Sequence, residues 1–350
     1  MRIKDVAQAA GVSTATVSHV INNTRYVTDE TRARVLETIE RLNYYPNAQA
    51  RSLALGRSST LGLVISDITN PFFPDLVKSI ERAAFERGYD VVLANTSYDL
   101  TRTSNYVRRF IERKLAGVLL MTSELDNELI EELRRQSVAV VFLDLGRTGA
   151  HMSNIVVDYE QGIEEAVVHL CALHHERFAF IGGPEHLTSA LKRRRAFENS
   201  LARHSPGAQA LIYESDFQLE GGWRTATEMF TTLTAAKRPT AFVVANDLMA
   251  LGVVRACRAA KLNVPDDVSI VGFDDIAFAE LADPPLTTVR LPRAELGVCA
   301  IEALMQTIQH PDGQGVEMHI ATHLVMRGST ARAPASAINT GDFGGTSQSQ

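Results

Sequence analysis

Residues 3–22 read IKDVAQAAGVSTATVSHVIN, and this stretch decides what the first part of the chain can be. A first helix is expected to stop at Gly11, because glycine readily takes the left-handed conformation that closes a helix. Ser13 stands where a helix N-cap is favoured, and a second helix is expected to run on to Asn22. Two helices joined by a tight turn with glycine predict a helix-turn-helix, a unit that places its second helix in the major groove of DNA.

A third helix is expected to complete this head. Thr28 is positioned to cap it, and acidic residues in its first turn would complement the helix dipole. Val35, Ile39 and Leu42 recur at helical spacing and are expected to form its buried stripe. The residues by themselves leave a second interpretation open, a plain three-helix domain whose threonine and serine side chains are only solvated.

Charge is distributed unevenly along the chain. The net charge is -6, but residues 1–59 carry eight basic against five acidic side chains, a net of +3, which leaves -9 for the rest. A small basic head on an acidic body is one indication of nucleic-acid binding, although a weak one when taken by itself.

The composition also bears on where the protein works. Three cysteines stand far apart, which disfavours both a disulfide framework and a zinc site and fits a reducing cytoplasm. The sequence has no run of about 18 apolar residues that could span a membrane. The charged amino terminus is unlike a signal peptide. We therefore expect a cytoplasmic protein.

After residue 60 the pattern becomes an alternation of strands and helices. Residues 61–65 form a continuous apolar run, which is typical of a strand buried on both faces. Further strands are expected at residues 91–93, 117–121, 138–143, 178–181, 241–244 and 269–272, and helices at 75–87, 101–114, 127–136, 190–203 and 247–260. The alternation predicts an α/β architecture with doubly wound parallel sheets, in two similar lobes at about 60–150 and 160–290. Ligands of such sheets bind beyond the carboxyl ends of the strands.

Several motifs resemble one family. They lie at residues 3–7, 10–13, 16–22, 27–28 and 31–32 in the head, at 44–47 and 50–53 after it, and at 70–73, 245–252, 271–275 and 285–289 in the body. Their order resembles the lactose/galactose repressor (LacI/GalR) family over about residues 2–328, with a head similar to the purine and ribose repressor branch. The resemblance implies a homodimeric transcription regulator, a repressor of a metabolic operon. Its body would be like a periplasmic binding protein and would hold a small effector between two lobes.

The expected domains follow from these patterns. Residues 1–46 form the helix-turn-helix head, 47–59 a hinge helix or linker, 60–330 the two-lobed effector-binding and dimerisation domain, and 331–350 a disordered tail. A helix as short as the hinge is marginal in water, so we expect it to order when two heads sit on a pseudopalindromic operator. The tail is rich in small polar residues and lacks heptads, which favours a dimer over a tetramer.

The resemblance implies contacts to the phosphate backbone of DNA. Hydroxyl and amide side chains suit this role because they donate to phosphate oxygens without reading the sequence. The residues that match are Ser18, Asn22, Thr28, Thr31 and Asn47. For each of them, a helix cap or an exposed polar residue is the structural alternative. Thr16 and Arg51 complete the expected interface.

Base reading is assigned by the resemblance to Thr14, Ala15 and His19. The methyl groups of the first two suit thymine, and the imidazole can donate to a guanine acceptor in the major groove. Leu53 matches a hinge leucine that wedges between base steps in the minor groove and kinks the duplex. The alternative for Leu53 is packing against the hinge of the dimer mate.

The resemblance also implies an effector site. Polar ligand positions match Asp274, Asn246 and Arg193, with Asp144 as a weaker match, and apolar walls match Phe217, Phe72 and Phe73. A carboxylate that accepts two hydroxyl hydrogen bonds suits a sugar, and a mostly apolar pocket with a few polar groups is the usual small-molecule site. The alternatives are a salt bridge between the lobes for Arg193 and Asp274, and core packing for Phe72.

The identity of the effector is left open between two chemistries. Where the purine-binding branch has an arginine, this chain has Leu187 before Ser189, which argues against a purine corepressor and favours a sugar or sugar derivative. The sequence leaves both an inducer and a corepressor open as the role of the effector. No cofactor, metal site or catalytic residue is expected, because the usual nucleophile-elbow, phosphate-loop, dinucleotide and zinc motifs are missing. The alternative function from a different class is a solute-binding receptor or an enzyme on the same fold.

Overall fold

The computed structural model describes residues 2–45, 58–122, 125–145 and 148–334. The chain divides into two compact units, Met1–Ser59 and Thr60–Gln350. The expected hinge lies almost wholly outside the described residues, and so do Asn47, Arg51 and Leu53.

The first unit holds three helices, α1 (Ile3–Ala10), α2 (Thr14–Asn22) and α3 (Asp29–Arg41). Gly11 ends α1 in the left-handed conformation, with φ 65°. The side chain of Ser13 accepts a hydrogen bond from the backbone of Thr16 at the start of α2. Both features confirm the predicted turn. A small core of alanine and valine side chains, which includes Val6, Val17 and Val35, closes the unit.

The predicted cap of α3 is wrong in its chemistry. Thr28 occupies the N-cap position, but its side chain makes no capping bond and donates to Thr31 Oγ1 at 2.9 Å. The hydroxyl of Thr28 therefore acts as a donor to Thr31 and accepts no bond from the backbone N–H groups of the first turn. The predicted stripe is confirmed for Val35, which is fully buried, whereas Ile39 and Leu42 are half-buried at its edge.

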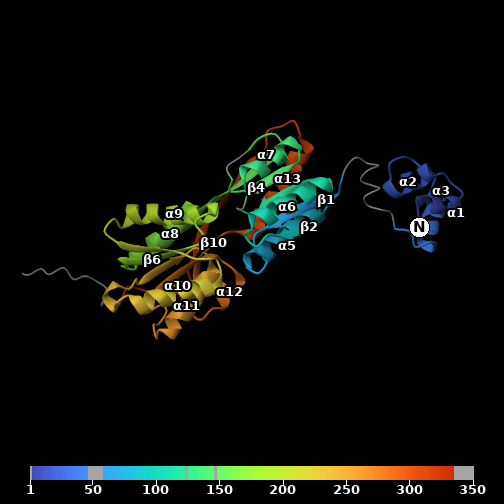
Figure 1. Cartoon of the computed structure of the whole chain (residues 1–350). Coiled ribbons are helices and arrows are strands. Elements are labelled where there is room, and N and C mark those ends of the chain that lie inside the picture. The colour runs from blue at the N-terminus through green and yellow to red at the C-terminus, as the bar shows by residue number, and fades with distance from the viewer. Residues whose placement is uncertain (1, 46–57, 123–124, 146–147, 335–350) are drawn as a thin grey trace, which may run out of the picture. The chain divides into compact units, whose positions relative to one another are not determined.

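The second unit contains two six-stranded sheets (Figure 1). The first sheet has the order β11-β5-β4-β3-β1-β2, and all its pairs are parallel. Its strands are β1 (Thr60–Ile65), β2 (Asp90–Asn95), β3 (Gly117–Met121), β4 (Val140–Leu143), β5 (Met152–Asp158) and β11 (Glu317–Ala321). The helices that pack on it are α5 (Phe72–Phe85), α6 (Leu100–Glu112), α7 (Asn127–Arg135) and α13 (Arg293–Gln309). One core cluster joins α6 and α7 to the sheet, and α5 packs with α13 in another.

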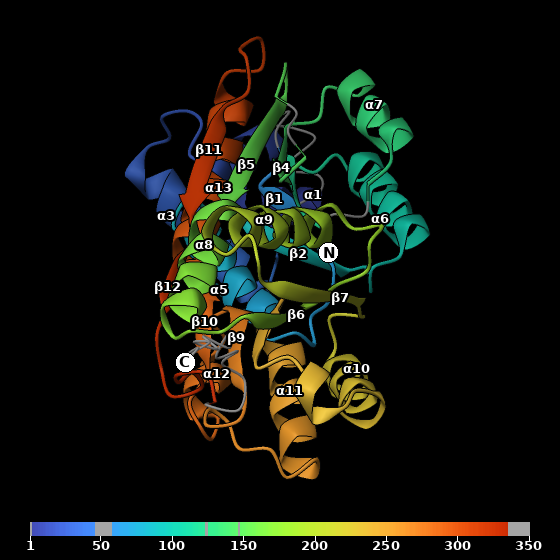
Figure 2. The same cartoon turned by 90° about the vertical axis from the view of Figure 1, so that its left-hand side faces the viewer.

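The second sheet has the order β12-β10-β9-β8-β6-β7. Its strands are β6 (Arg177–Gly182), β7 (Gln209–Glu214), β8 (Ala241–Val244), β9 (Ser269–Asp274), β10 (Thr287–Arg290) and β12 (His323–Val325), of which β12 runs antiparallel to β10. The flanking elements are α8 (Tyr159–Ala172), α9 (Thr188–His204), α10 (Leu219–Thr232), the 3-10 turn η1 (Ala235–Lys237), α11 (Asp247–Ala259) and α12 (Ala277–Leu281). Figure 2 shows α8 and α9 on one side of this sheet and α10 and α11 on the other.

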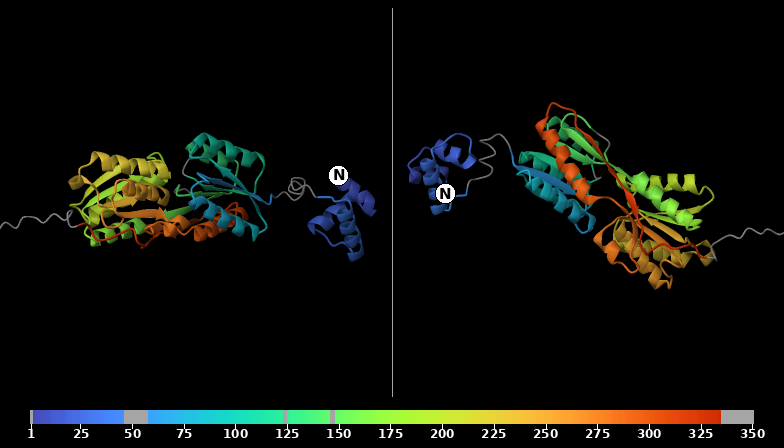
Figure 3. Two further views of the ribbon diagram at one scale, coloured as in Figure 1. Left: turned by 90° about the horizontal axis from the view of Figure 1, so that it is seen from below. Right: turned by 180° about the vertical axis from the view of Figure 1, so that it is seen from behind.

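The α/β class and the two doubly wound lobes are confirmed, but their predicted boundaries are wrong. The chain leaves the first lobe after β5, returns to it at α13 and crosses back after β11, so that each lobe is built from separated segments. Figure 3 shows orange-red α13 beside the blue α5 of the first lobe. Three crossings between the lobes fix their edges to each other at one side of the cleft.

The expected tail begins later than residue 331. Ala331 exchanges hydrogen bonds with Ser269, and the backbone N–H of Ala333 donates to Leu173 at 2.8 Å. These backbone bonds tie the segment to the second lobe, and residues 335–350 lie outside the described part of the chain. Within that part, no helix combines the length and the apolar character that crossing a membrane requires.

Candidate functional site

The first candidate surface is the outer side of α2. Thr14 and Ala15 stand exposed at its amino-terminal end, and His19 follows one turn later, half-buried. Val17 and Val20 point the opposite way into the core of the head. The helix therefore offers a short, neutral, polar and methyl-bearing edge, with a size and chemistry that suit base edges in a major groove.

Most polar side chains predicted to contact phosphates pair with each other in the head. Asn22 Nδ2 donates to Ser18 Oγ at 3.2 Å, while Asn22 Oδ1 has no hydrogen-bond partner among the described residues. The hydroxyl of Thr16 lies 2.9 Å from that of the capping Ser13. Thr28 and Thr31 form the hydroxyl pair at the start of α3. Each pair lies at a helix end, so a capping or pairing role and a phosphate contact are compatible.

The second candidate site is a cleft between the two lobes of the body. The structure brings all seven residues predicted to bind an effector to the wall of one cavity of about 60 Å³. They are Phe72, Phe73, Asp144, Arg193, Phe217, Asn246 and Asp274. The prediction did not include Ser66, Asn70, Tyr98, Met121, Thr122, Leu143, Tyr159, Ser189 and Leu291, which complete the wall.

Arg193 is the central cation of this cleft. Its guanidinium carbon lies 4.1 Å from the ring centroid of Phe273, 5.2 Å from that of Tyr159 and 5.7 Å from that of Phe217. Rings at these distances attract a desolvated cation, which lowers the cost of keeping it buried. Nη1 donates to the carbonyl of Ala245, and Nε has no hydrogen-bond partner among the described residues. The side chain thus has one buried donor without a hydrogen-bond partner among the described residues.

Asp274 supplies the facing acceptor at the carboxyl end of β9. Its Oδ1 lies 3.5 Å from Arg193 Nη2, a long contact that leaves acceptor capacity on the carboxylate. Burial raises the pKa of Asp274 to about 6, against the opposing effect of Arg193 and Arg293. Both members of the Arg193–Asp274 pair belong to the second lobe, so the expected alternative of a salt bridge between the lobes is wrong. The two lie on α9 and β9 of one sheet.

Asp144 and Asn246 line the cavity but already have structural partners. The carboxylate of Asp144 accepts from Tyr159 Oη at 2.6 Å, from the backbone of Val157 at 2.9 Å and from Lys192 Nζ at 3.1 Å. Asn246 caps α11 through its oxygen and donates from Nδ2 to the carbonyl of Phe217 at 2.8 Å. These two side chains shape the cleft and offer fewer unused polar atoms than Arg193 and Asp274.

Contacts from one lobe to the other hold the cleft closed. Lys192 on α9 pairs with Asp144 of the first lobe, and Gln218 Nε2 donates to Asp67 Oδ2 at 2.8 Å. The rings of Tyr98 and Phe217 stack across the gap with centroids 6.1 Å apart. The cavity beside them has a volume of about 60 Å³, whereas small-molecule pockets span about 300–1,000 Å³. A bound effector therefore requires a wider separation of the lobes at this point.

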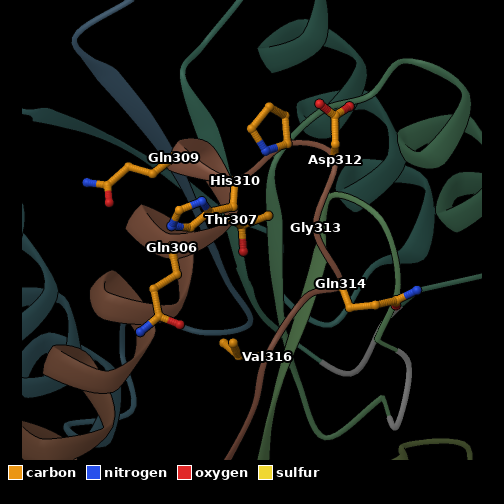
Figure 4. Close-up of a pocket in the computed structure, with 9 residues that line it drawn as sticks. Gln306, Thr307, Gln309, His310, Asp312, Gly313, Gln314 and Val316 are labelled. Atoms are coloured by element: carbon orange, nitrogen blue, oxygen red, sulfur yellow. The ribbon is translucent and has the colours of Figure 1, made fainter.

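A larger recess lies at the end of α13 and has a different character. It has a volume of about 600 Å³ and is lined by Gln306, Thr307, Gln309, His310, Pro311, Asp312, Gly313, Gln314 and Val316. Figure 4 shows the side chains of Gln309, Asp312 and Gln314 spreading in different directions rather than converging. The cleft, with its buried ion pair and aromatic walls, is the stronger candidate for a ligand.

Three of the cleft residues that the prediction missed follow a common rule. Ser66 and Thr122 come directly after β1 and β3, and Tyr98 follows β2 within three residues. Polar or aromatic residues just beyond the carboxyl ends of parallel strands could have been selected as a set. Lys192 and Gln218 carry no such signal, because their role depends on the opposite lobe.

Comparison with known families matches both units. Residues 2–47 match bacterial regulatory proteins of the lacI family, and residues 167–330 match a periplasmic binding protein-like domain. The chain is 34% identical to the HTH-type transcriptional repressor PurR of Photobacterium profundum, over 93% of this chain and 98% of that protein. It is 37% identical to the ribose operon repressor of Escherichia coli K12, over 93% of this chain and 99% of that protein.

Solved structures agree with these sequence matches. The Lac repressor dimer bound to operator and the anti-inducer ONPF has a TM-score of 0.83 at 29% identity, over 95% of this chain and 99% of that one. A lacI-family regulator from Enterococcus faecium with bound ribose has a TM-score of 0.70 at 28% identity, over 78% of this chain and 99% of that one.

A helix-turn-helix head together with a two-lobed, ligand-binding body defines a DNA-binding transcription regulator that is controlled by a small molecule. The chain belongs to the lacI family of bacterial regulatory proteins. The relatives named above are repressors rather than enzymes.

Proposed function

We propose that this chain is a cytoplasmic transcriptional repressor, not an enzyme, which binds a pseudopalindromic operator as a homodimer. A small sugar-like effector in the cleft controls that binding. The observation that carries the proposal is the convergence of Arg193, Asp274 and the aromatic walls on one cavity between the lobes, in a chain whose other unit is a helix-turn-helix.

The DNA-binding half of the proposal rests on the exposed edge of α2. Thr14, Ala15 and His19 read bases, and hydroxyl and amide groups of the head contact phosphates, as assigned from the family resemblance. The proposed head spans residues 1–46 and the proposed linker 47–59, and the body extends from residue 60 past 330 to include the bonded residues 331–334. Within the linker, Asn47 and Arg51 contact the DNA backbone and Leu53 wedges into the minor groove, as the family resemblance implies. A Lac repressor dimer solved bound to operator supports DNA binding in general.

The dimer half of the proposal rests on apolar side chains that stand in solvent. Phe85 at the end of α5 is 72% exposed, with Val92 and Leu93 exposed on the adjoining edge strand β2. In the second lobe, Leu281 of α12 is 77% exposed and Phe278 is 52% exposed. Single exposed apolar side chains are common on protein surfaces, but neighbouring ones that form one patch are a feature of protein interfaces. The homodimer covers both, and a Lac repressor solved as a dimer supports that arrangement.

A sugar is the effector class that the cleft chemistry favours. A ring hydroxyl both donates and accepts, so neighbouring hydroxyls can satisfy the unused Nε–H of Arg193 and the carboxylate of Asp274 together. Phe72 and Phe217 provide apolar faces for the ring carbons. Leu187 is 1% exposed and holds no polar group for a purine base. The relative with bound ribose supports the same class.

Two measurements on the full-length chain test this function. Selection from fragmented genomic DNA should enrich a palindromic site. Calorimetry against pentoses, hexoses, their phosphates and purine bases should identify one sugar that binds tightly. Failure to enrich any site would overturn the proposed repressor function. Tight hypoxanthine or guanine binding without sugar binding would overturn the effector class.

A further inference from the structure

The loop after α2 holds a contact on which the base-reading edge depends. Nδ1 of His19 lies 2.8 Å from the hydroxyl oxygen of Thr24, five residues further on. The other ring nitrogen, Nε2, makes no hydrogen bond within the described part of the chain. One nitrogen of the imidazole is therefore held by the protein, and the other remains available.

The backbone of the loop makes this contact possible. Asn23 ends α2 in the left-handed conformation, with φ 48° and ψ 40°, and this turns the chain back so that Thr24 lies beside His19. Arg32 of α3 donates from Nη2 to Asn23 Oδ1 at 3.0 Å and ties the turn to the third helix. Val35, one turn later on α3, is fully buried in the core of the head. The hydroxyl of Thr24 is thus placed through a chain of contacts that begins in that core.

We propose that Thr24 is a positioning residue for base recognition, which fixes the ring of His19 so that Nε2 is presented to the base edge. The proposal rests on the proposed function of the head and deepens it. A ring held at Nδ1 cannot rotate to exchange its two nitrogens, and it therefore offers the DNA one group at one place. The orientation and the protonated nitrogen of a histidine are commonly set by the partner of its other nitrogen.

The chemistry of the hydroxyl connects the contact to sequence preference. When Thr24 donates to Nδ1, the neutral ring carries its proton on Nε2, and that N–H donates to a guanine acceptor. Without the hydroxyl, both tautomers and both ring orientations become accessible. The same histidine would then donate to guanine or accept from the amino group of cytosine or adenine. Loss of Thr24 should consequently lower discrimination between bases more than it lowers affinity.

The test compares full-length wild type with Thr24→Val, Thr24→Ser, His19→Ala and the double variant Thr24→Val/His19→Ala. Valine keeps the shape of threonine but neither donates nor accepts, and serine restores the hydroxyl. Each protein is titrated with the operator that wild type selects, with every single-base-pair substitution of it and with random DNA. The two single variants and the double variant form a double-mutant cycle, which isolates the coupling between the two side chains.

We expect Thr24→Val to lose about three- to tenfold of the preference at the base pair that His19→Ala also affects, because one hydrogen-bonded contact is loosened rather than removed. Binding to random DNA should stay unchanged, serine should restore the preference, and valine should have no further effect when His19 is absent. Equal weakening on every sequence, or an additive loss in the double variant, would overturn the proposal, because Thr24 would then contact the DNA itself.

A second measurement separates this proposal from the proposed function. If wild type selects no site, the repressor function fails, and the imidazole ¹⁵N shifts of histidine-labelled protein without DNA decide the role of Thr24. The signal of His19 is the one that disappears in His19→Ala. It should report a single tautomer in wild type and Thr24→Ser and an average of two in Thr24→Val. Identical shifts in all three proteins would contradict the proposal.

Discussion

The head and the cleft use polar side chains in opposite ways. In the head, Thr14 and Ala15 are exposed and neutral, and they lie on one short helix together with His19. In the cleft, Arg193 and Asp274 are buried and charged, and 81 positions of sequence separate them. A surface that meets DNA can remain hydrated until it binds, whereas a buried pair must be compensated inside the protein at all times. Substitutions in the cleft should therefore cost more than substitutions in the head.

The largest effect is expected from Arg193→Met. Removing one partner of a buried, hydrogen-bonded charge pair costs up to about 3–5 kcal/mol of folding free energy, and here Arg293 still compensates part of the charge of Asp274. Affinity for the sugar that the panel identifies should fall at least a hundredfold, while operator binding without effector persists. Isothermal calorimetry and a gel shift measure the two quantities. The matched control is Arg195→Met, an exposed arginine of the same helix. Sugar affinity within threefold of wild type would show that Arg193 is not a ligand.

His19→Ala should give the next largest effect, restricted to DNA. Loss of one base contact costs about 1–3 kcal/mol, which is roughly 5- to 150-fold at one base pair of each half-site. Titration of the operator and of random DNA by fluorescence anisotropy measures the ratio. Equal weakening on both DNAs would place His19 at the phosphates and would remove the base-reading role from this position of α2.

The pH dependence of effector binding should be smaller and should come from the cleft. Burial raises the pKa of Asp274 to about 6. The carboxylate is the form that accepts two hydroxyl groups, so sugar affinity should hold above pH 7 and fall as the pH drops through 6. It should be about tenfold weaker at pH 5, one unit below that pKa. Calorimetry from pH 5 to 8 checks this, and Asp274→Asn should abolish the dependence. A flat profile in wild type would contradict the ionised role.

The smallest effect is expected from Lys192→Met at the mouth of the cleft. The lysine is about one-third exposed and pairs with Asp144 across the lobes, so its loss should destabilise the arrangement of the lobes seen here by no more than about 1 kcal/mol. Sugar affinity should rise about two- to fivefold, because less free energy is spent on opening. Lys78→Met, on the exposed side of α5, is the control. Weaker sugar binding would contradict this, because it would show that Lys192 contacts the sugar rather than only holding the lobes together.

Sequence reasoning succeeded where the structure depends on neighbouring residues. The turn at Gly11, the Ser13 cap and the extent of α2 follow from residues within a few positions of each other, and all three are confirmed. The predicted capping bond of Thr28 is wrong, because the orientation of its hydroxyl depends on local geometry that the residue type does not encode.

The body was predicted less completely because its lobes are not continuous in sequence. The strand β7 is half-buried at the edge of its sheet and lacks the apolar run that identified β1, so it was missed. The return of α13 to the first lobe depends on packing against α5, more than 200 positions earlier. Family resemblance identified seven residues of the cavity wall, but the closing contacts of Lys192 and Gln218 required both lobes to be seen together.

Coupling between the cleft and the head is the central claim, and one titration addresses it. Operator affinity is measured by anisotropy with and without saturating sugar, and sugar affinity is measured with and without operator. The operator affinity and the sugar affinity should change by the same factor, about 5- to 150-fold, because a coupling free energy of about 1–3 kcal/mol is reciprocal. Operator affinity that stays the same while the sugar demonstrably occupies the cleft would contradict it.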